Sequence, residues 1–96
     1  MSLPLEVLVK YVKPSAKQDF VDLMHEIEEA TGGSESMSDL PEEKIQEFAD
    51  RYNQMLPEPY EIDKEAPRMF LEHAYANYIE SKRYKAFEAK INQLRS

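Results

Sequence analysis

The chain has 96 residues, which is enough for one compact domain and too few for two. Hydrophobic residues make up 42% and charged residues 32%, a mixture that supports a modest core and argues against wholesale disorder. No window is long and apolar enough for a membrane span, and a net charge of −7 argues against general binding to nucleic acid.

The N-terminus and the cysteine count bear on location. Met1-Ser2-Leu3-Pro4 has no basic stretch followed by an apolar one, so no secretory signal is predicted. The chain contains no cysteine, which excludes disulfides, thiolate metal ligands and thiol nucleophiles. Both observations favour a cytoplasmic location.

The stretch over residues 3–12 fits two patterns. The helical spacing uses Leu5, Leu8, Val9 and Val12, and the alternation of a strand uses Leu5, Val7, Val9 and Tyr11. Pro14 ends the element in either case, because the residue before a proline is pushed out of the helical region. Helix and strand both stay open here.

A helix is predicted over residues 16–31. Ser15 and Gln18 have the spacing of a capping box, and Gly32-Gly33 predicts a left-handed stop. The apolar residues between them recur at three- and four-residue steps: Phe20, Leu23, Met24, Ile27 and Ala30.

A second helix is predicted over residues 40–56. Asp39 is an acidic candidate cap, and Pro41 is tolerated in a first turn. The apolar residues keep helical spacing until Pro57: Ile45, Phe48, Ala49, Tyr52, Met55 and Leu56. Pro57-Glu58-Pro59 then predicts an extended connection.

The last predicted element begins after Asp63, another candidate cap. Its apolar residues fall into two groups: Phe70, Leu71, Ala74 and Tyr78, and then Tyr84, Phe87, Ile91 and Leu94. The periodicity slips at Ser81-Lys82-Arg83, so the pattern predicts one long helix with a bend there, or two helices that meet there. A shorter alternative has a strand over residues 68–73.

Charge is divided unequally along the chain. Residues 82–96 carry five basic side chains and one acidic one, a net charge of +4. Residues 15–81 carry a net charge of −12. We expect the basic tail to fold back on the acidic helices or to bind the acidic helices of a partner.

Metal binding and catalysis receive little support. Two helix faces combine histidine with acidic or amide residues: Asp22, His25 and Glu29, and His73, Asn77 and Glu80. Neither histidine follows a glutamate by three residues, as in the metal sites of helix bundles, so no metal is assigned. The chain has no Gly-x-Ser-x-Gly elbow and no phosphate-binding glycine loop. A non-enzymatic protein without a cofactor is favoured, and no catalytic residue is assigned.

Aromatic residues cluster near the C-terminus. Tyr75, Tyr78 and Tyr84 lie close to Arg83 and other basic residues, a mixture that could stack single-stranded nucleic acid. The negative charge of the rest of the chain disfavours that reading. An aromatic stripe in the core or facing a protein partner is favoured, and the predicted partner-binding residues are Tyr75, Tyr78, Arg83 and Tyr84.

The acidic runs support an alternative mode of binding. Glu26-Glu28-Glu29 and Glu42-Glu43-Glu47 could imitate a nucleic-acid backbone and occupy a basic groove of a partner. Small, acidic, helical proteins are common among bacteriocin-immunity and phage-inhibitor proteins, an analogy of class alone.

Two segments carry a family resemblance. The first segment is Val7-Leu-Val-Lys-Tyr-Val-Lys-Pro14, followed by the predicted helix that contains Phe20, Leu23 and Ile27. The second segment is Tyr78-Ile-Glu-Ser-Lys-Arg-Tyr-Lys-Ala-Phe-Glu-Ala-Lys-Ile91. Residues 67–73 would be a strand before the second segment. The two segments resemble the opening strand, first helix and late helix of the antibiotic biosynthesis monooxygenase-like family, whose members are small dimeric α+β barrels.

The resemblance implies a ferredoxin-like dimeric barrel with a cofactor-free oxygenase-like pocket, or a barrel without activity. The sequence departs from the family in three places. A predicted helix over residues 39–56 stands where the family has a strand, no closing strand follows Leu94, and Tyr78 replaces the usual histidine. No catalytic residue is therefore carried over.

The sequence as a whole favours an all-α fold in a single domain over residues 1–96, a small three- to four-helix bundle with a long, bent C-terminal helix. The alternative is the α+β barrel. The predicted function is a non-enzymatic protein–protein interaction module of a regulatory or inhibitory kind. Its expected partner is another protein, a homo-oligomer of itself, or both, with neither nucleic acid nor membrane. The alternative function is a monooxygenase-like barrel protein with a small-molecule pocket.

Overall fold

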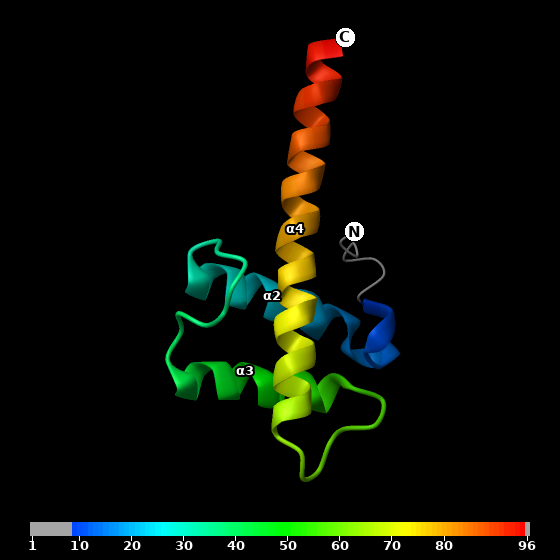
Figure 1. The fold of residues 1–96 in the computed structure, drawn as a ribbon. Coiled ribbons are helices and arrows are strands. Elements are labelled where there is room, and N and C mark those ends of the chain that lie inside the picture. Colours follow the sequence, from blue (N-terminus) through cyan, green and yellow to red (C-terminus); the bar gives the residue numbers. More distant parts are fainter. Residues whose placement is uncertain (1–8, 96) are drawn as a thin grey trace.

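The computed structural model describes residues 9–95. The elements in chain order are two short 3-10 turns, η1 (Val9–Tyr11) and η2 (Pro14–Ala16), and three α-helices, α2 (Lys17–Thr31), α3 (Glu42–Met55) and α4 (Glu65–Arg95) (Figure 1). No strand occurs in residues 9–95. The predicted all-α fold is therefore confirmed, and the alternative α+β barrel is wrong.

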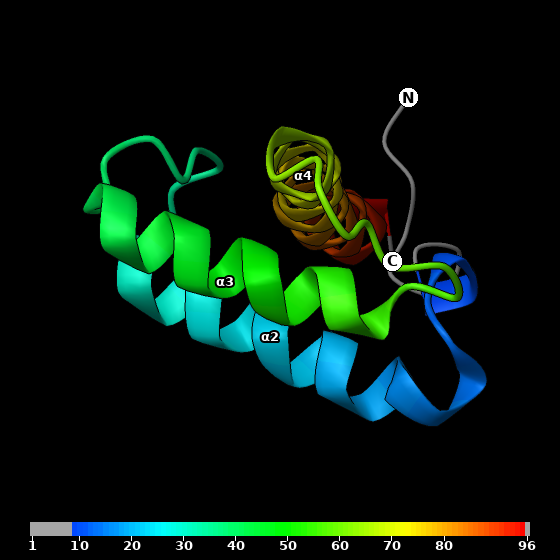
Figure 2. The same ribbon diagram turned by 90° about the horizontal axis from the view of Figure 1, so that it is seen from below.

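The helices form two layers. α2 and α3 lie side by side and run in opposite directions, and α4 crosses over both of them (Figure 2). The C-terminal half of α4 extends well beyond this pair (Figure 1). The molecule is consequently elongated, with principal extents of 53, 30 and 21 Å.

The predicted first helix forms, as α2, but its beginning differs from the prediction. Ser15 lies inside η2, the turn that Pro14 begins, and Ala16 precedes the helix without any side-chain cap. The predicted capping box is therefore wrong, because Pro14 begins a 3-10 turn that includes Ser15 and leaves it one residue before the cap position. Gln18 instead donates a hydrogen bond to Asp22 at 3.0 Å.

The end of α2 agrees with the prediction. Gly32 has a φ of 69° and Gly33 a φ of 91°, both in the left-handed region. The Gly33 N–H donates to the carbonyl oxygen of Glu28 at 3.0 Å, which closes the helix. The left-handed stop at Gly32-Gly33 is confirmed.

The second predicted helix, over residues 40–56, is confirmed as α3 with slightly narrower bounds. Asp39 does not cap it. Pro41 occupies the cap position with φ −58° and ψ 143°, and no side chain bonds to the first turn. The rigid proline thus sets the start of the helix, and Asp39 lies two residues too far upstream to reach the free N–H groups.

The connection from α3 to α4 contains neither helix nor strand over residues 56–64, in agreement with the prediction from Pro57 and Pro59 that no helix continues there. Asp63 ends it, and its Oδ1 accepts hydrogen bonds from the N–H groups of Glu65 at 2.9 Å and Ala66 at 3.1 Å. The predicted cap at Asp63 is therefore confirmed. The carboxylate also complements the partial positive charge at the start of α4.

α4 is a single helix of 31 residues without interruption. Figure 1 shows it as a nearly straight rod, so the predicted bend or break at Ser81-Lys82-Arg83 is wrong. The alternative strand over residues 68–73 is wrong as well, since this stretch lies within the helix.

The N-terminal stretch over residues 3–12 falls partly outside the described residues. Of its described part, Val9–Tyr11 forms η1 and Val12 is buried. The N–H of Lys13 donates to the carbonyl oxygen of Met55 at 2.8 Å, which ties this segment to the end of α3.

The core lies between the two layers. Its fully buried members include Phe20, Leu23, Met24, Ile27, Ile45, Phe48, Leu71 and Tyr75. The helical spacing predicted most of these residues, but it missed Tyr75 and included Phe70, which is 49% exposed. Two bidentate ion pairs hold the helices together at the surface, Arg51 with Glu26 and Arg68 with Glu42.

The substitution Gly32→Ala should lower the free energy of unfolding by about 1 kcal/mol, because a side chain is strained at positive φ. No atom lies within 4 Å of the added Cβ, so the cost is one of backbone conformation alone. Gly32→Asn is the matched control, since asparagine tolerates this conformation and should lose less stability. Urea unfolding followed by circular dichroism measures both variants, and equal losses would contradict the explanation.

Candidate functional site

The C-terminal half of α4 is the most exposed helical segment of the structure. The body of the protein covers α4 as far as Ser81. From residue 82 to residue 95 every side chain is exposed except that of Ile91, which is half-buried. We call residues 82–95 the distal segment. It contains no glycine or proline and is rich in strong helix formers, which explains why the helix continues where the other helices no longer cover it.

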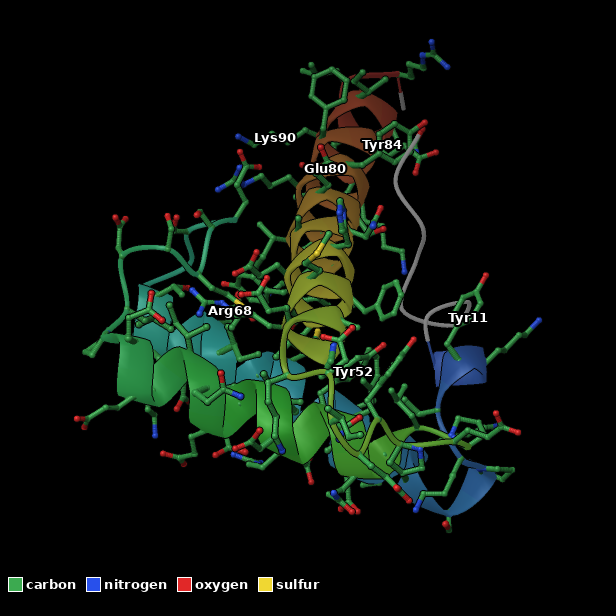
Figure 3. All side chains as sticks on the ribbon, turned by 60° about the horizontal axis from the view of Figure 1, so that its bottom comes forward. Tyr11, Tyr52, Arg68, Glu80, Tyr84 and Lys90 are labelled. Atoms are coloured by element: carbon green, nitrogen blue, oxygen red, sulfur yellow. The ribbon has the colours of Figure 1, made fainter. Side chains whose placement is uncertain are left out.

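An apolar stripe runs along the distal segment. It consists of Tyr84, Phe87, Ile91 and Leu94, at steps of three, four and three residues. Tyr84 is 62%, Phe87 60% and Leu94 86% exposed. Figure 3 shows Tyr84 on the projecting part of α4, together with Glu80 and Lys90.

The stripe faces away from the core. Phe87 follows the buried Tyr78 by nine residues, and a rotation of about 100° per residue places it on the opposite side of the helix. This explains the slip in periodicity at residues 81–83. The apolar face changes sides there because α4 leaves the body, and the helix itself stays straight.

The end of α2 holds the middle of α4 through buried hydroxyl groups. The Tyr75 hydroxyl lies 2.6 Å from Oγ1 of Thr31 and donates to the carbonyl oxygen of Ser34. The Tyr78 hydroxyl donates to Glu28 at 2.8 Å. Burial raises the pKa of both tyrosines, so each hydroxyl keeps its proton.

Two basic residues extend this contact. Lys82 forms an ion pair with Glu28, and Arg83 forms one with Glu35 at 3.1 Å. The hydrogen bond from Lys82 lowers the pKa of Glu28. We call these contacts the α2–α4 clamp; they run from Tyr75 to Arg83 on α4 and from Glu28 to Glu35 at the end of α2 and in the turn that follows it.

The four predicted partner-binding residues occupy two environments. Tyr75 and Tyr78 are 0% and 4% exposed and belong to the clamp, so a partner would reach them only if α4 separated from α2. Arg83 and Tyr84 are exposed at the base of the distal segment. Their role in partner binding stays a prediction. The structure adds Phe87 and Leu94, which the sequence pattern placed on an apolar face without assigning them to binding.

A groove of about 650 Å³ lies beside the first half of α4. Aromatic rings dominate its lining: Tyr11, Phe20, Tyr52, Tyr60 and Phe70. Polar groups come from His73 and Asn77 on α4 and from Glu58 in the connection between α3 and α4. Sequence reasoning missed the groove, because its residues come from η1, α2, α3, the connection and α4, and no local pattern joins them.

Asn53 fixes one wall of this groove. Its side-chain amide donates to the carbonyl oxygen of Tyr60 and accepts from the Tyr60 N–H, both at 2.8 Å. Asn53 is buried, and these two hydrogen bonds both satisfy its side-chain amide and hold the connection against α3. The ring centre of Tyr60 lies 6.3 Å from that of Phe70, so the connection also contacts α4 at the groove.

The described residues offer little for metal chemistry. Residues 9–95 contain no group of three or more histidine, aspartate or glutamate side chains that could hold a metal ion. The ring of His25 lies 6.1 Å from that of Tyr78, and His73 lines the groove.

Comparisons with protein-family models, with curated proteins and with solved structures found no match to this chain. Within the part of the chain that the structure describes, no helix is both long and apolar enough to cross a membrane.

The substitution Glu28→Gln should lower the free energy of unfolding by about 1 kcal/mol at neutral pH, because it removes the charge that Lys82 and Tyr78 contact. The pKa of Glu28 is lowered from its usual 4.5 in the folded state. Its stabilising effect is therefore complete above pH 4.5 and is lost as the pH falls through the lowered pKa. Urea unfolding across this pH range should show a flatter acid limb for the variant than for the parent protein.

Glu29→Gln is the matched control, because it makes the same charge change one residue further on, at an exposed position. An equally flattened acid limb in this control would contradict a specific role for Glu28 in the clamp.

Proposed function

We propose that the protein is a non-enzymatic interaction module that binds another protein chain through the distal segment. The apolar stripe carries this proposal. Tyr84, Phe87 and Leu94 present three large side chains on one line of a helix, each at least 60% exposed. Complete burial of such a side chain is worth about 1.5–3 kcal/mol, so a partner that covers the stripe gains much of its binding free energy there.

The spacing of the stripe indicates the kind of contact. Steps of three and four residues keep apolar side chains on the line along which one helix packs against another, or lies in a groove. A lipid surface would demand a broader apolar face, and the stripe is a single narrow line. A protein surface with a helix or a groove is therefore the expected counterpart.

Basic residues frame the stripe. Lys90 and Arg95 stand directly beside Ile91 and Leu94 in the sequence, and both are exposed, whereas Arg83, next to Tyr84, is already paired with Glu35. Such a frame favours a partner with an acidic rim around an apolar centre. A module of this form acts by occupying a surface of its partner, which is a regulatory or inhibitory role.

The alternative mode of binding, in which the acidic runs of α2 and α3 imitate a nucleic-acid backbone, has less support than binding through the distal segment. Several of their carboxylates are already paired within the chain: Glu26 with Arg51, Glu28 with Lys82, Glu42 with Arg68 and Glu47 with Lys44. These pairs reduce the negative charge that a basic partner would meet on α2 and α3. The distal segment is consequently the stronger candidate.

A photoreactive benzoylphenylalanine in place of Phe87 should give a protein–protein adduct in the cells that naturally make the protein, because the stripe is covered when the module is bound. The same group in place of Ala89 is the matched control. Ala89 is exposed on the same segment but lies about 200° around the helix from Phe87. Gel mobility and mass spectrometry detect the adduct and identify the second chain.

The outcome decides the proposal directly. Strong crosslinking at position 87 with weak crosslinking at position 89 supports binding through the stripe. Equal crosslinking at both positions, or none at either, would overturn it.

A further inference from the structure

We infer that the chain which covers the distal segment is a second copy of this protein, and that the two copies pair through antiparallel α4 helices. Each distal segment then lies over the groove of the other copy. This inference rests on the proposed function, because it uses the same stripe and names its partner. It adds the groove as the receiving surface and fixes the relative direction of the two chains.

The spacing of the stripe continues toward the start of α4 without a change of step, through three polar positions and then an aromatic one. Going backward from Tyr84, the positions on this line are Glu80, Asn77, His73 and Phe70, again at alternating steps of four and three residues. Heptad spacing of this kind keeps one line of a helix in contact with another helix over its whole length. Most of α4 can therefore lie against one partner helix.

The line is symmetrical about residue 82. Leu94 lies as far beyond residue 82 as Phe70 lies before it. Two antiparallel copies centred there bring together four pairs of positions: Leu94 with Phe70, Ile91 with His73, Phe87 with Asn77, and Tyr84 with Glu80. Each pair occurs twice, as a two-fold axis requires.

This arrangement covers two apolar surfaces at once. Phe70, His73 and Asn77 line the groove, and they are the positions that Leu94, Ile91 and Phe87 of the other copy approach. Phe70 is itself 49% exposed and Tyr60 38%. Leu94, at 86% the most exposed apolar residue of the distal segment, thus meets Phe70 at the rim of the groove.

Charge selects the antiparallel direction. The distal end of the chain, residues 82–96, carries a net charge of +4, and residues 15–81 carry −12. Antiparallel copies place each basic segment along the acidic body of the other copy, including Glu58 at the groove. Parallel copies would place the two basic segments side by side and the two acidic bodies side by side, which is unfavourable on both counts.

Sedimentation equilibrium of the full chain should show a reversible dimer whose dissociation constant rises with salt. Phe87→Ala should raise that constant about tenfold or more, whereas Ala89→Ser on the opposite side of the helix should leave it unchanged. Both positions are exposed and outside the core, so the helical content of both variants should match the parent protein. A chain that stays monomeric at high protein concentration and low salt would overturn the inference.

Cysteine crosslinking tests the direction of pairing, because the native chain contains no cysteine. Asn77→Cys and Phe87→Cys chains, one of them carrying a mass tag, are mixed and oxidised. The mixed disulfide should dominate over either homodisulfide. Asn77→Cys mixed with Ala89→Cys is the matched control and should crosslink weakly.

The results separate this inference from the proposed function. A Phe87→Cys homodisulfide as the main product indicates parallel copies and overturns the antiparallel dimer. A photo-adduct at position 87 with a different protein, together with a monomeric chain, leaves the interaction module standing and overturns the second copy as its partner. Absence of both the adduct and the dimer overturns both.

Discussion

The clamp between the end of α2 and the middle of α4 determines the shape of the molecule. The glycine turn after α2 brings Thr31 and the Ser34 carbonyl group to the Tyr75 hydroxyl, and the Glu28 carboxylate contacts both Tyr78 and Lys82. These directional bonds prevent α4 from sliding along or rolling over the α2–α3 layer. α4 consequently leaves the body at a defined residue with a defined side facing outward, which gives the distal segment a fixed orientation.

The surface ion pairs have a related role. Arg68 contacts Glu42 on α3, and Arg51 contacts Glu26 on α2, each through two nitrogen atoms. Exposed pairs of this kind contribute only about 0.2–1 kcal/mol each, so the buried apolar faces supply most of the stability. The forked geometry of arginine mainly selects one relative position of the helices. Some of the acidic side chains of residues 15–81 thereby form ion pairs that fix how the helices pack against one another.

Local signals in the sequence predicted the helices well. Apolar spacing gave the extents of α2 and α3 to within two residues, and the stops or caps at Gly32 and Asp63 depend only on neighbouring backbone groups. The predicted cap at Ser15 did not form, because Pro14 begins a 3-10 turn that includes Ser15.

The candidate site was harder to predict, because it depends on what covers each face. From the sequence alone, Tyr75 and Tyr78 look like part of an exposed binding stripe. In the structure they are buried, and the groups that their hydroxyls contact lie more than 40 positions away in the sequence. The slip at residues 81–83 has the same origin, since a sequence records which residues are apolar and not which side the body protects. The apolar spacing of the sequence predicted the stripe, but no sequence pattern predicted the groove.

The projecting part of α4 has a consequence for how any complex forms. Isolated helices shorter than about 12–15 residues are marginal in water, and the distal segment is of that size. Because only the base of the distal segment is anchored, its last turns are the part of α4 that we expect to fray first, starting from the C-terminal end. A surface that covers the segment must also suppress this fraying, so part of the interaction free energy is consumed in ordering the helix. Such a contact would respond to temperature through the helix–coil equilibrium as well as through burial of apolar area.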